Sequence, residues 1–521
     1  MALSVRKVCL PRNLNFYLFK NNYIIVLSSQ NPVRYLRGSR HGFRRVLGRT
    51  ESKFQELIKS VKESSKKSVV NTSKVPDTLL KSTSPKDESS KISTKLHDTP
   101  HEDIHKRLDG IITPLKNLTY ARQLERKYGK CLSLLRMFGE RLRSLKMPIA
   151  LGADKLPCPV ELMLPSTIIE AYRNQDEFSI GIGADGNPQT VGFFIESLEG
   201  ALKNVCVSPD NLVIIKNNHK NFVKDFENYI NSSIPPTLQD GDGSYWKSIS
   251  MRSNMAGDIM GIILLNNQGL SPKQIQQEKK NLREYFEKSG QHYNLKSLYF
   301  QENFLCKAAN DQSPYELLFG ESYIIEELNG LKFRISPQSF FPRNTNAAGS
   351  MYNALKQLCR VNDSTTVLDI FCGTGPVSLT FSPNVKKCIG FDTCSKSIED
   401  AKFNSQLNNL SNTEFIHGSP EAVLRDIFTC DYHSDLVAIV NSSKVELSKT
   451  AIRFLRECKY LKKVIYISTK PRTAVDNFIR LCKPAGSESY LGKYFVPVFA
   501  LPVDLCPQTE HYGLIMMFQR L

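Results

Sequence analysis

The sharpest chemical feature of the sequence is a glycine-rich turn that follows an apolar run near residue 370. The segment Leu368–Pro376 reads Leu-Asp-Ile-Phe-Cys-Gly-Thr-Gly-Pro, so a strand passes through Gly373 and Gly375 into a helix that begins with proline, a favoured first helical residue. Glycine lets the backbone approach a ligand that a Cβ would repel. Asp392 ends the next apolar run, where a carboxylate can accept hydrogen bonds from a ribose diol. The short form Asp-x-x-x-Gly-x-Gly, which starts at Asp369, favours S-adenosylmethionine over a dinucleotide.

A turn of this kind needs a sheet that holds it, and the sequence from Thr365 onward predicts one. Apolar runs of strand length alternate there with helical stretches, which indicates a mainly parallel, doubly wound sheet covered by helices on both faces. Ligands of such sheets bind beyond the carboxyl ends of the strands. The predicted strands are Thr366–Phe371, Lys387–Asp392, Glu414–His417, Leu436–Asn441, Val464–Thr469, Tyr494–Leu501 and Leu514–Phe518, with helices such as Ser395–Asn409 and Glu446–Cys458 between them. We therefore expect an α/β domain over residues 342–521.

The preceding region, residues 104–341, has a different pattern. Leucines at helical spacing between Thr119 and Lys146, interleaved with Arg and Lys, predict an amphipathic basic helix. Its residues Arg122, Arg126, Lys127 and Lys130 are candidate contacts for RNA phosphates. From Cys158 to Phe341 short apolar runs are separated by turn signals such as Asp185-Gly, which predicts an antiparallel α+β region.

The first hundred residues carry most of the positive charge. Residues 1–50 contain ten Lys and Arg and no Asp or Glu, a composition typical of a mitochondrial targeting segment, although a basic tail that touches nucleic acid is the alternative. Residues 51–103 are rich in Ser and Lys and predict a disordered linker. These residues account for most of the net charge of +18, so an RNA-binding body needs a local basic patch.

Several classes of protein are disfavoured by composition. The chain of 521 residues is too long for one ordinary domain, and no apolar run approaches the ~20 residues of a membrane helix. Its thirteen cysteines are scattered and contain no Cys-x-x-Cys pair, so neither a disulfide framework nor a zinc site is indicated. We expect no metal and no membrane partner, and a reducing compartment such as the mitochondrial matrix.

Several motifs follow one another between Ile112 and Leu521 in a recognisable order. They are Tyr172-Arg-Asn, Gly192-Phe-Phe, Phe333-Arg-Ile-Ser-Pro-Gln-Ser-Phe-Phe-Pro-Arg-Asn-Thr, the glycine loop, Phe403-Asn-Ser-Gln-Leu-Asn-Asn-Leu and Asp504-Leu-Cys-Pro-Gln-Thr-Glu-His-Tyr-Gly. With them the sequence resembles the RNA uracil-C5-methyltransferase family, most closely its mitochondrial tRNA/rRNA branch. The resemblance implies a Rossmann-like class I methyltransferase domain at 342–521, an RNA-binding α+β domain before it, and tRNA or rRNA as partner.

The resemblance also implies a reaction. In the family a cysteine thiolate adds to uracil C6, and C5 then attacks the methyl group of S-adenosylmethionine. A glutamate removes the C5 proton before the enzyme is released. Covalent addition is needed because uracil C5 is a poor nucleophile, and the target base must leave its stack to be attacked.

The sequence departs from the family at the positions that carry this reaction. Thr469, within Ser-Thr-Lys-Pro, stands at the place of the nucleophilic cysteine, and Gly513 stands at the place of the base in the family's terminal His-x-Glu. Asn441 replaces the aspartate of an Asp-Pro-Pro-Arg loop, and Pro342 replaces a cofactor-contacting glutamine. Loss of a general base alone costs about 10²–10⁴ in rate. We expect Asp369, Gly373, Gly375, Asp392, Asn441 and Pro342 to form a weakened cofactor site, and neither Thr469 nor Gly513 to be competent.

Methyl transfer would then require another cysteine to act as the nucleophile in place of Thr469. Cys506 lies in the terminal motif, which in the family is close to the active site, so its thiol is the candidate substitute. Cys482 is expected to be a core residue, and Cys372 is expected to shape the glycine turn.

The sequence is therefore compatible with three functions. The first is a mitochondrial RNA-binding protein on the uracil-methyltransferase fold whose catalysis is impaired. The second is an active RNA (uracil-5-)-methyltransferase that uses a substitute nucleophile and base. The third is a small-molecule methyltransferase, which the RNA-family motifs before residue 341 disfavour.

Overall fold

The computed structural model describes residues 14–18, 24–28 and 31–35, and residues 101–520 apart from 197–203, 234–244, 268, 304–313, 430–434, 443–445 and 485–491. The chain divides into two units, Met1–Thr99 and Pro100–Leu521. The first contains an antiparallel sheet of β1 (Leu14–Leu18), β2 (Ile24–Ser28) and β3 (Asn31–Tyr35). Most of the predicted targeting segment 1–50, and nearly all of the predicted linker 51–103, lie outside the described residues.

The second unit begins with two helices and a mixed sheet. The helices are α2 (His101–Ile112) and α3 (Tyr120–Ser144). In the described part of this region a seven-stranded sheet follows in the order β10-β9-β8-β7-β4-β5-β6. Its strands are β4 (Gln175–Gly181), β5 (Thr190–Glu196), β6 (Asn204–Val207), β7 (Trp246–Ser253), β8 (Ile259–Asn266), β9 (Leu295–Asn303) and β10 (Glu316–Gly320).

One strand pair corrects the prediction of an antiparallel sheet. β8 and β9 are parallel, whereas the other neighbouring strands are antiparallel. The reason is the connection, because the 18-residue helix α5 (Pro272–Ser289) carries the chain back across the sheet before β9 starts. Helix α5 begins with a capping box in which Ser271 and Gln274 each satisfy the other's backbone amide. The short helix η1 (Gly290–Tyr293) completes the crossover.

The two faces of this mixed sheet have different neighbours. Helices α4 (Asn217–Ser232) and α5 cover one face with buried aromatic rings, among which Phe222 and Phe286 stack with centroids 5.1 Å apart. On the opposite face Met260, Ile262 and Tyr299 belong to a core that they share with the C-terminal domain. The central sheet is therefore packed directly against the domain that carries the glycine loop.

The C-terminal domain has the predicted α/β architecture. Its seven-stranded sheet has the order β15-β14-β13-β16-β17-β19-β18 in the described residues, with β13 to β17 parallel and β19 antiparallel to both neighbours. The strands are β13 (Thr365–Ile370), β14 (Lys387–Asp392), β15 (Thr413–His417), β16 (Asp435–Ser442), β17 (Leu461–Ser468), β18 (Val496–Val503) and β19 (Gly513–Gln519). Every residue of β13 is buried, as expected for a strand covered on both faces. The predicted fold class is confirmed.

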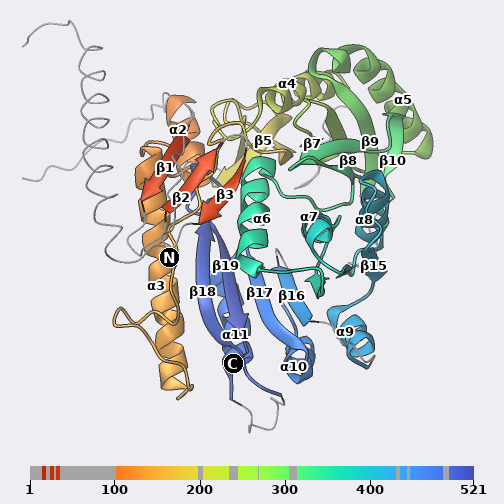
Figure 1. The fold of residues 1–521 in the computed structure, drawn as a ribbon. Coiled ribbons are helices and arrows are strands. Elements are labelled where there is room, and N and C mark those ends of the chain that lie inside the picture. The colour runs from red at the N-terminus through yellow and green to blue at the C-terminus, as the bar shows by residue number, and fades with distance from the viewer. Residues whose placement is uncertain are drawn as a thin grey trace, which may run out of the picture. The chain divides into compact units, whose positions relative to one another are not determined.

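Helices cover both faces of this sheet (Figure 1). One face carries α6 (Thr345–Cys359), α7 (Pro376–Phe381), the short helix η2 (Ser382–Asn384) and α8 (Ser395–Leu407). The other carries α9 (Pro420–Thr429), α10 (Lys449–Glu457) and α11 (Pro471–Cys482). Helix α3 also packs on this second face, where Phe138 meets the ring of Phe478 edge to face at 5.7 Å. The predicted basic helix is thus part of the C-terminal core, although it precedes the central sheet in the sequence.

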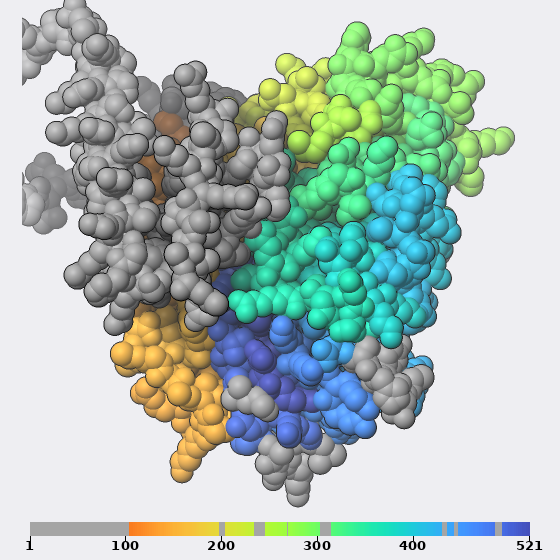
Figure 2. Space-filling model, in the orientation of Figure 1, coloured from red at the N-terminus to blue at the C-terminus, as the bar shows by residue number. Residues whose placement is uncertain are grey.

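A hairpin joins the two sheets. Strands β11 (Ile324–Leu328) and β12 (Leu331–Ile335) form it, and α6 follows after Asn344, whose side chain caps the helix through the amide of Ala347. In the space-filling view the residues around 330–360 lie between the central region and the C-terminal sheet (Figure 2). The sequence did not predict α6. An asparagine cap before it is the signal that was available.

Candidate cofactor and active site

The glycine loop after β13 has the strained geometry that its sequence suggests. Phe371, Gly373 and Gly375 have φ angles of 62°, 57° and 87°, a left-handed region that favours glycine. The chain then enters α7 at Pro376, as predicted. Phe371 adopts the same region without that freedom, which indicates a loop that its surroundings hold in place.

Asp369 fixes the start of α7 and does not contact the cavity. One of its carboxylate oxygens accepts hydrogen bonds from the backbone amide and the hydroxyl of Ser378, at 3.0 and 2.7 Å. The side chain is fully buried, and burial raises its pKa to about 7. In the structure Asp369 therefore binds the first turn of α7, the helix that follows the glycine loop, whereas the sequence analysis predicts a direct cofactor contact.

A cavity of about 170 Å³ opens beside this loop at the carboxyl ends of the strands. Four of the residues predicted to bind cofactor line it: Pro342, Gly373, Asp392 and Asn441. Asp369 and Gly375 do not line it. Further lining residues that sequence reasoning missed are Gln338, Phe340, Tyr352, Phe371, Cys372, Thr374, Pro376, Thr393, Cys394 and Ser397.

Asp392 is the last residue of β14 and lines the cavity. Its two carboxylate oxygens accept hydrogen bonds from the backbone amides of Gly373, at 3.0 Å, and Cys394, at 2.9 Å. A carboxylate offers about four lone-pair sites, so two acceptor positions remain for a diol. The half-buried side chain is therefore both oriented by the loop and able to bind a ribose.

Two further features fit an adenosyl cofactor. A Cβ built on Gly373 meets nothing closer than the carbonyl oxygen of Phe340 at 3.8 Å, so the backbone is open on the cavity side. Thr374 lines the cavity, and its buried hydroxyl has no hydrogen-bond partner among the described residues. Unpaired buried hydroxyls are costly, and a ligand that bonds to this one removes the cost.

The far wall of the cavity carries two of the substituted positions. Asn441, at the end of β16, interacts with the hydroxyl of Tyr352 on α6, and burial raises the pKa of that tyrosine. Pro342 offers a ring and no donor, and its carbonyl oxygen accepts a hydrogen bond from the amide of Asn174 at 2.7 Å. This wall therefore presents an amide and a pyrrolidine ring, and it lacks the charge that an aspartate would bring.

The structure places Thr469 and Gly513 close to each other. β17 and β19 are antiparallel, with Ser468 paired to Leu514, so the next position places Thr469 beside Gly513. Thr469 lies one residue beyond β17 and is exposed. Gly513 is buried, and a Cβ at this position would come within 2.7 Å of the Leu505 side chain. These two neighbouring positions therefore offer the hydroxyl of Thr469 and, at Gly513, no side chain at all.

None of the three discussed thiols is activated. Cys482 is fully buried in the core, as predicted, and burial raises its pKa. Cys372 is also fully buried, and burial raises its pKa well above the ordinary value. Cys506 is half-buried, and burial raises the pKa of its thiol although nearby cations such as Lys127 oppose the shift. A raised pKa leaves little thiolate near neutral pH.

The terminal loop that holds Cys506 is tied to α3 by ion pairs. Lys127 and Asp504 are both fully buried and form an ion pair at 2.6 Å. Arg126 and Lys130 both pair with Glu510 at 2.7 Å. In the sequence, the basic residues of this helix suggest contacts for RNA phosphates. The structure corrects that interpretation for Lys127, which is inaccessible, and shows that its neighbours hold the loop.

The Tyr172-Arg-Asn motif has a similar internal role. The Tyr172 hydroxyl donates to the carbonyl oxygen of Pro507 at 3.0 Å, and Arg173 pairs with Asp176. The Asn174 amide bonds the turn before α6, as described above. The motif therefore joins the central sheet to both the terminal loop and the cofactor cavity.

Two other kinds of site are absent from the part of the chain that the structure describes. No group of three or more His, Cys, Asp and Glu side chains among these residues could hold a metal ion. No helix in the same part of the chain is long and apolar enough to cross a membrane.

The fold and the cavity define a class of protein. A seven-stranded sheet with one antiparallel strand next to its edge, a glycine loop after β13 and an acid at the end of β14 give the C-terminal domain the fold of a class I methyltransferase domain. Residues 361–488 match a family model described as "Methyltransferase domain". The tRNA (uracil-54, C5)-methyltransferase of Pyrococcus abyssi, solved with S-adenosyl-L-homocysteine, has the same fold, with a TM-score of 0.53 at 18% identity over 78% of this chain and 84% of that one.

Relatives of known name narrow the class to a family. The "tRNA (uracil-5-)-methyltransferase homolog B" of Danio rerio is 38% identical over 421 residues, which cover 80% of this chain and 87% of that protein. The Homo sapiens homolog B is 34% identical over 80% of this chain and 84% of its own length. The Homo sapiens homolog A is 34% identical over 80% of this chain and 68% of its own. The chain therefore belongs to the tRNA (uracil-5-)-methyltransferase family, and this family implies that it binds S-adenosylmethionine.

Proposed function

We propose that the chain is a mitochondrial RNA-binding member of this family that has lost most or all methyl transfer. One observation carries the proposal. The neighbouring ends of β17 and β19 present Thr469 and Gly513, at the two places where the family's mechanism needs a thiolate and a carboxylate. A threonine hydroxyl holds its proton far more tightly than a thiol does, so it is a poor nucleophile for C6 of uracil. The two carboxylates of the terminal loop, Asp504 and Glu510, are engaged in ion pairs with α3.

An active methyltransferase is the competing function, and it depends on Cys506. The thiol lies in the same loop as Gly513, but burial raises its pKa and so disfavours the thiolate. A small-molecule methyltransferase is disfavoured by family membership and by the central sheet, which packs on the cofactor domain as one unit.

The partner that we propose is tRNA, with rRNA as the second RNA of the same class, because the Danio rerio and Homo sapiens relatives reported above are named for tRNA. The proposal requires that the purified full chain binds an unmodified tRNA transcript at about 50 mM salt and binds it more weakly at about 200 mM, since phosphate contacts release counterions. Absence of binding at the lower salt would contradict it.

Cofactor binding is expected to persist in weakened form. Replacing Asp392 by Ala removes the acceptor that the loop holds in place, and one lost polar contact to a buried partner costs about 1–3 kcal/mol. Calorimetry with S-adenosylmethionine is therefore expected to show a Kd about 5- to 150-fold higher for Asp392→Ala. The matched control is Asp363→Ala, an exposed aspartate in the turn before β13 and away from the cavity. Equal affinities for Asp392→Ala and the natural chain would contradict this site.

Localisation is a proposal that rests on residues 1–50, which hold ten basic residues and no acidic one. A positively charged, acid-free segment is driven into the matrix by the membrane potential. A fluorescent reporter fused to residues 1–50 is expected to enter mitochondria, and a fusion with five of the arginines changed to glutamine is expected to stay in the cytosol. A natural fusion that remains cytosolic would overturn the mitochondrial part of the proposal.

A further inference from the structure

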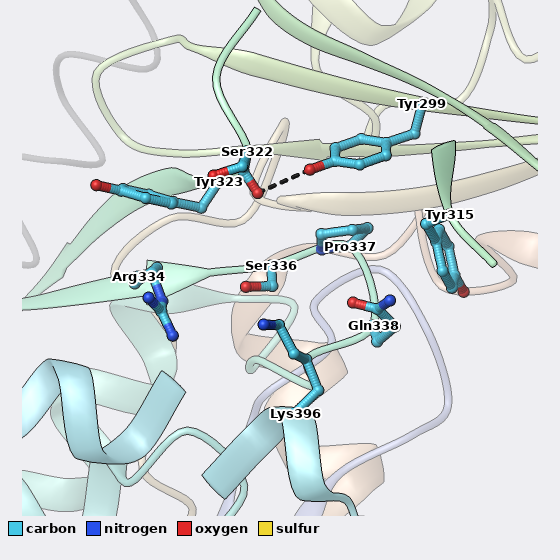
Figure 3. A pocket seen from close by; sticks show the side chains of 9 residues that line it. All are labelled: Tyr299, Tyr315, Ser322, Tyr323, Arg334, Ser336, Pro337, Gln338 and Lys396. Carbon is cyan, nitrogen blue, oxygen red and sulfur yellow. Dashed lines mark hydrogen bonds between the residues drawn. The ribbon is translucent and has the colours of Figure 1, made fainter. Parts of the chain in front are cut away.

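A second cavity lies next to the cofactor cavity and is not used by the proposed chemistry. It measures about 180 Å³ and lies between the central sheet, the β11–β12 hairpin and the start of α8. Gln338 lines both cavities, so the two adjoin. Figure 3 shows its lining residues, which are Tyr299, Tyr315, Ser322, Tyr323, Arg334, Ser336, Pro337, Gln338 and Lys396.

Three tyrosines from separate segments dominate this cavity. Tyr299 on β9 is held by its hydroxyl, which donates to the carbonyl oxygen of Ser322 at 2.8 Å (Figure 3). Its ring meets that of Tyr315 edge to face, with centroids 6.5 Å apart. Tyr323 is half-buried and lies within 5.7 Å of the Arg334 guanidinium. Fixed aromatic rings at the edge of a cavity are surfaces on which a planar base can stack.

The charged residues of the cavity are cationic. Arg334 and Lys396 line it, and among the described residues no Asp or Glu does. The position of the Arg334 side chain is fixed by a hydrogen bond from its Nε to the buried carboxylate of Asp400, at 2.6 Å. Lys396 pairs with the exposed Glu399, one turn along α8, and its side chain rises from the helix toward Ser336 in Figure 3. A guanidinium held by a buried carboxylate and an ammonium on an exposed side chain, both beside aromatic rings, suit a phosphate next to a base.

A third cationic side chain, that of Arg252, lies near this cavity but does not line it. Arg252 is 7% exposed, its Nε is fully buried, and its side chain makes no hydrogen bond or ion pair with the described residues. Its cross-strand partner on β8 is Met260, and Met260 and Tyr299 belong to the same core, so Arg252 lies on the sheet face that carries the tyrosine. Burial lowers the pKa of Arg252 to about 10, with a smaller contribution from Arg343, whereas Tyr315 and Asp400 act in the opposite direction. An arginine remains charged at pH 7 even so, and it leaves an excess of positive charge beside the cavity.

We propose that this second cavity holds one nucleotide of the bound RNA, with its base against the tyrosines and its phosphate toward Lys396 and Arg334. The inference rests on the proposed RNA-binding function and adds a place where a nucleotide other than the target uridine is held. The order of strands separates the two places. The cavity is lined by Lys396 of α8, the helix that follows β14, whereas Thr469 lies one residue beyond β17, which is two strands from β13 in the sheet.

Two substitutions at the rim test this without disturbing the core. Tyr323→Ala removes a half-buried ring, and Lys396→Glu reverses the charge of a side chain that is 41% exposed. The matched control is Lys224→Glu, an exposed lysine on α4, which covers the opposite face of the central sheet. Binding of an unmodified tRNA transcript to the full chain is titrated at several salt concentrations, and S-adenosylmethionine binding is measured in parallel by calorimetry.

Tyr323→Ala is expected to weaken tRNA binding about tenfold at every salt concentration, because one base loses its stacking surface. Lys396→Glu is expected to weaken it further at low salt and to reduce the slope of log K against log salt by about one or more. Lys224→Glu should leave both quantities close to those of the natural chain. Cofactor affinity should stay within about twofold in all three, which separates this cavity from its neighbour.

The outcomes distinguish this inference from the function on which it rests. If the natural chain binds tRNA and both rim variants bind it equally well, the nucleotide site is wrong and the RNA-binding function stands. If the natural chain binds no tRNA, the proposed function fails first. Uridine monophosphate is titrated as a second probe. Tight binding of the free nucleotide without binding of tRNA would overturn the assignment to RNA.

Discussion

The natural chain, incubated with S-adenosylmethionine and an unmodified tRNA transcript, is expected to form no 5-methyluridine above the level of a reaction without protein. The reason is the pair of positions at the ends of β17 and β19, where Thr469 and Gly513 offer neither a thiolate nor a carboxylate. Losing the base alone costs about 10²–10⁴ in rate, and losing the nucleophile removes the covalent route. Nucleoside analysis of the tRNA by mass spectrometry measures the product directly.

A repaired variant sharpens the comparison. Thr469 is exposed, so Thr469→Cys places a thiol where a uracil base of the RNA has access to it. Thr469→Ser is the matched control, because it keeps a hydroxyl at this position. Gly513→Glu needs room, because the new Cβ would come within 2.7 Å of the Leu505 side chain, and we pair it with Leu505→Ala. We expect the variant that combines Thr469→Cys, Gly513→Glu and Leu505→Ala with Pro342→Gln to gain 5-methyluridine formation. Formation of 5-methyluridine by the natural chain would show that our interpretation of these positions is wrong.

Replacing Lys127 by alanine is expected to destabilise the C-terminal domain by about 3–5 kcal/mol. Lys127 and Asp504 are both fully buried, and the ammonium also donates to the carbonyl oxygen of Cys506 at 2.9 Å. Removing the lysine leaves a buried carboxylate that retains only weaker partners, such as the Tyr120 hydroxyl at 3.0 Å. Denaturant unfolding followed by circular dichroism measures the loss.

The same helix provides the control. Lys130 lies further along α3 and pairs with Glu510 at 2.7 Å, but its side chain is 46% exposed. Lys130→Ala is expected to cost no more than about 1 kcal/mol, since exposed ion pairs contribute little. The double variant Lys127→Met with Asp504→Asn should recover part of the loss, because it removes both buried charges. Equal destabilisation by Lys127→Ala and Lys130→Ala would contradict the buried ion pair as the main tie between α3 and the terminal loop.

The sequence predicted the C-terminal sheet well, because its strands are apolar runs buried on both faces. The predicted strand Lys387–Asp392 coincides with β14 residue for residue, and its last residue, Asp392, lines the cavity. The prediction for β17 ended one residue late, at Thr469. The strand ends at Ser468, and Thr469 follows it as an exposed residue at the position where the family has its nucleophilic cysteine.

What the sequence could not predict depends on contacts between distant segments. Lys127 looks like a surface residue of a basic helix, and only the packing of α3 against the terminal loop reveals its partner Asp504. Tyr352 lines the cofactor cavity from a helix that the pattern did not indicate. Arg252 carries no local signal at all, since its burial is set by the way the central sheet meets the C-terminal domain.

Covalent trapping tests the central claim most directly. Fluorine at C5 of uridine cannot be removed as a proton, so an enzyme that adds a nucleophile to C6 and transfers the methyl group stays bound to RNA that contains 5-fluorouridine. The natural chain is therefore incubated with such a tRNA and S-adenosylmethionine and analysed on a denaturing gel, with Thr469→Cys in parallel. We predict no RNA–protein complex for the natural chain, whatever its affinity for tRNA. A denaturant-resistant complex of the natural chain, mapped by mass spectrometry to Cys506 or any other residue, would contradict the account and identify the nucleophile.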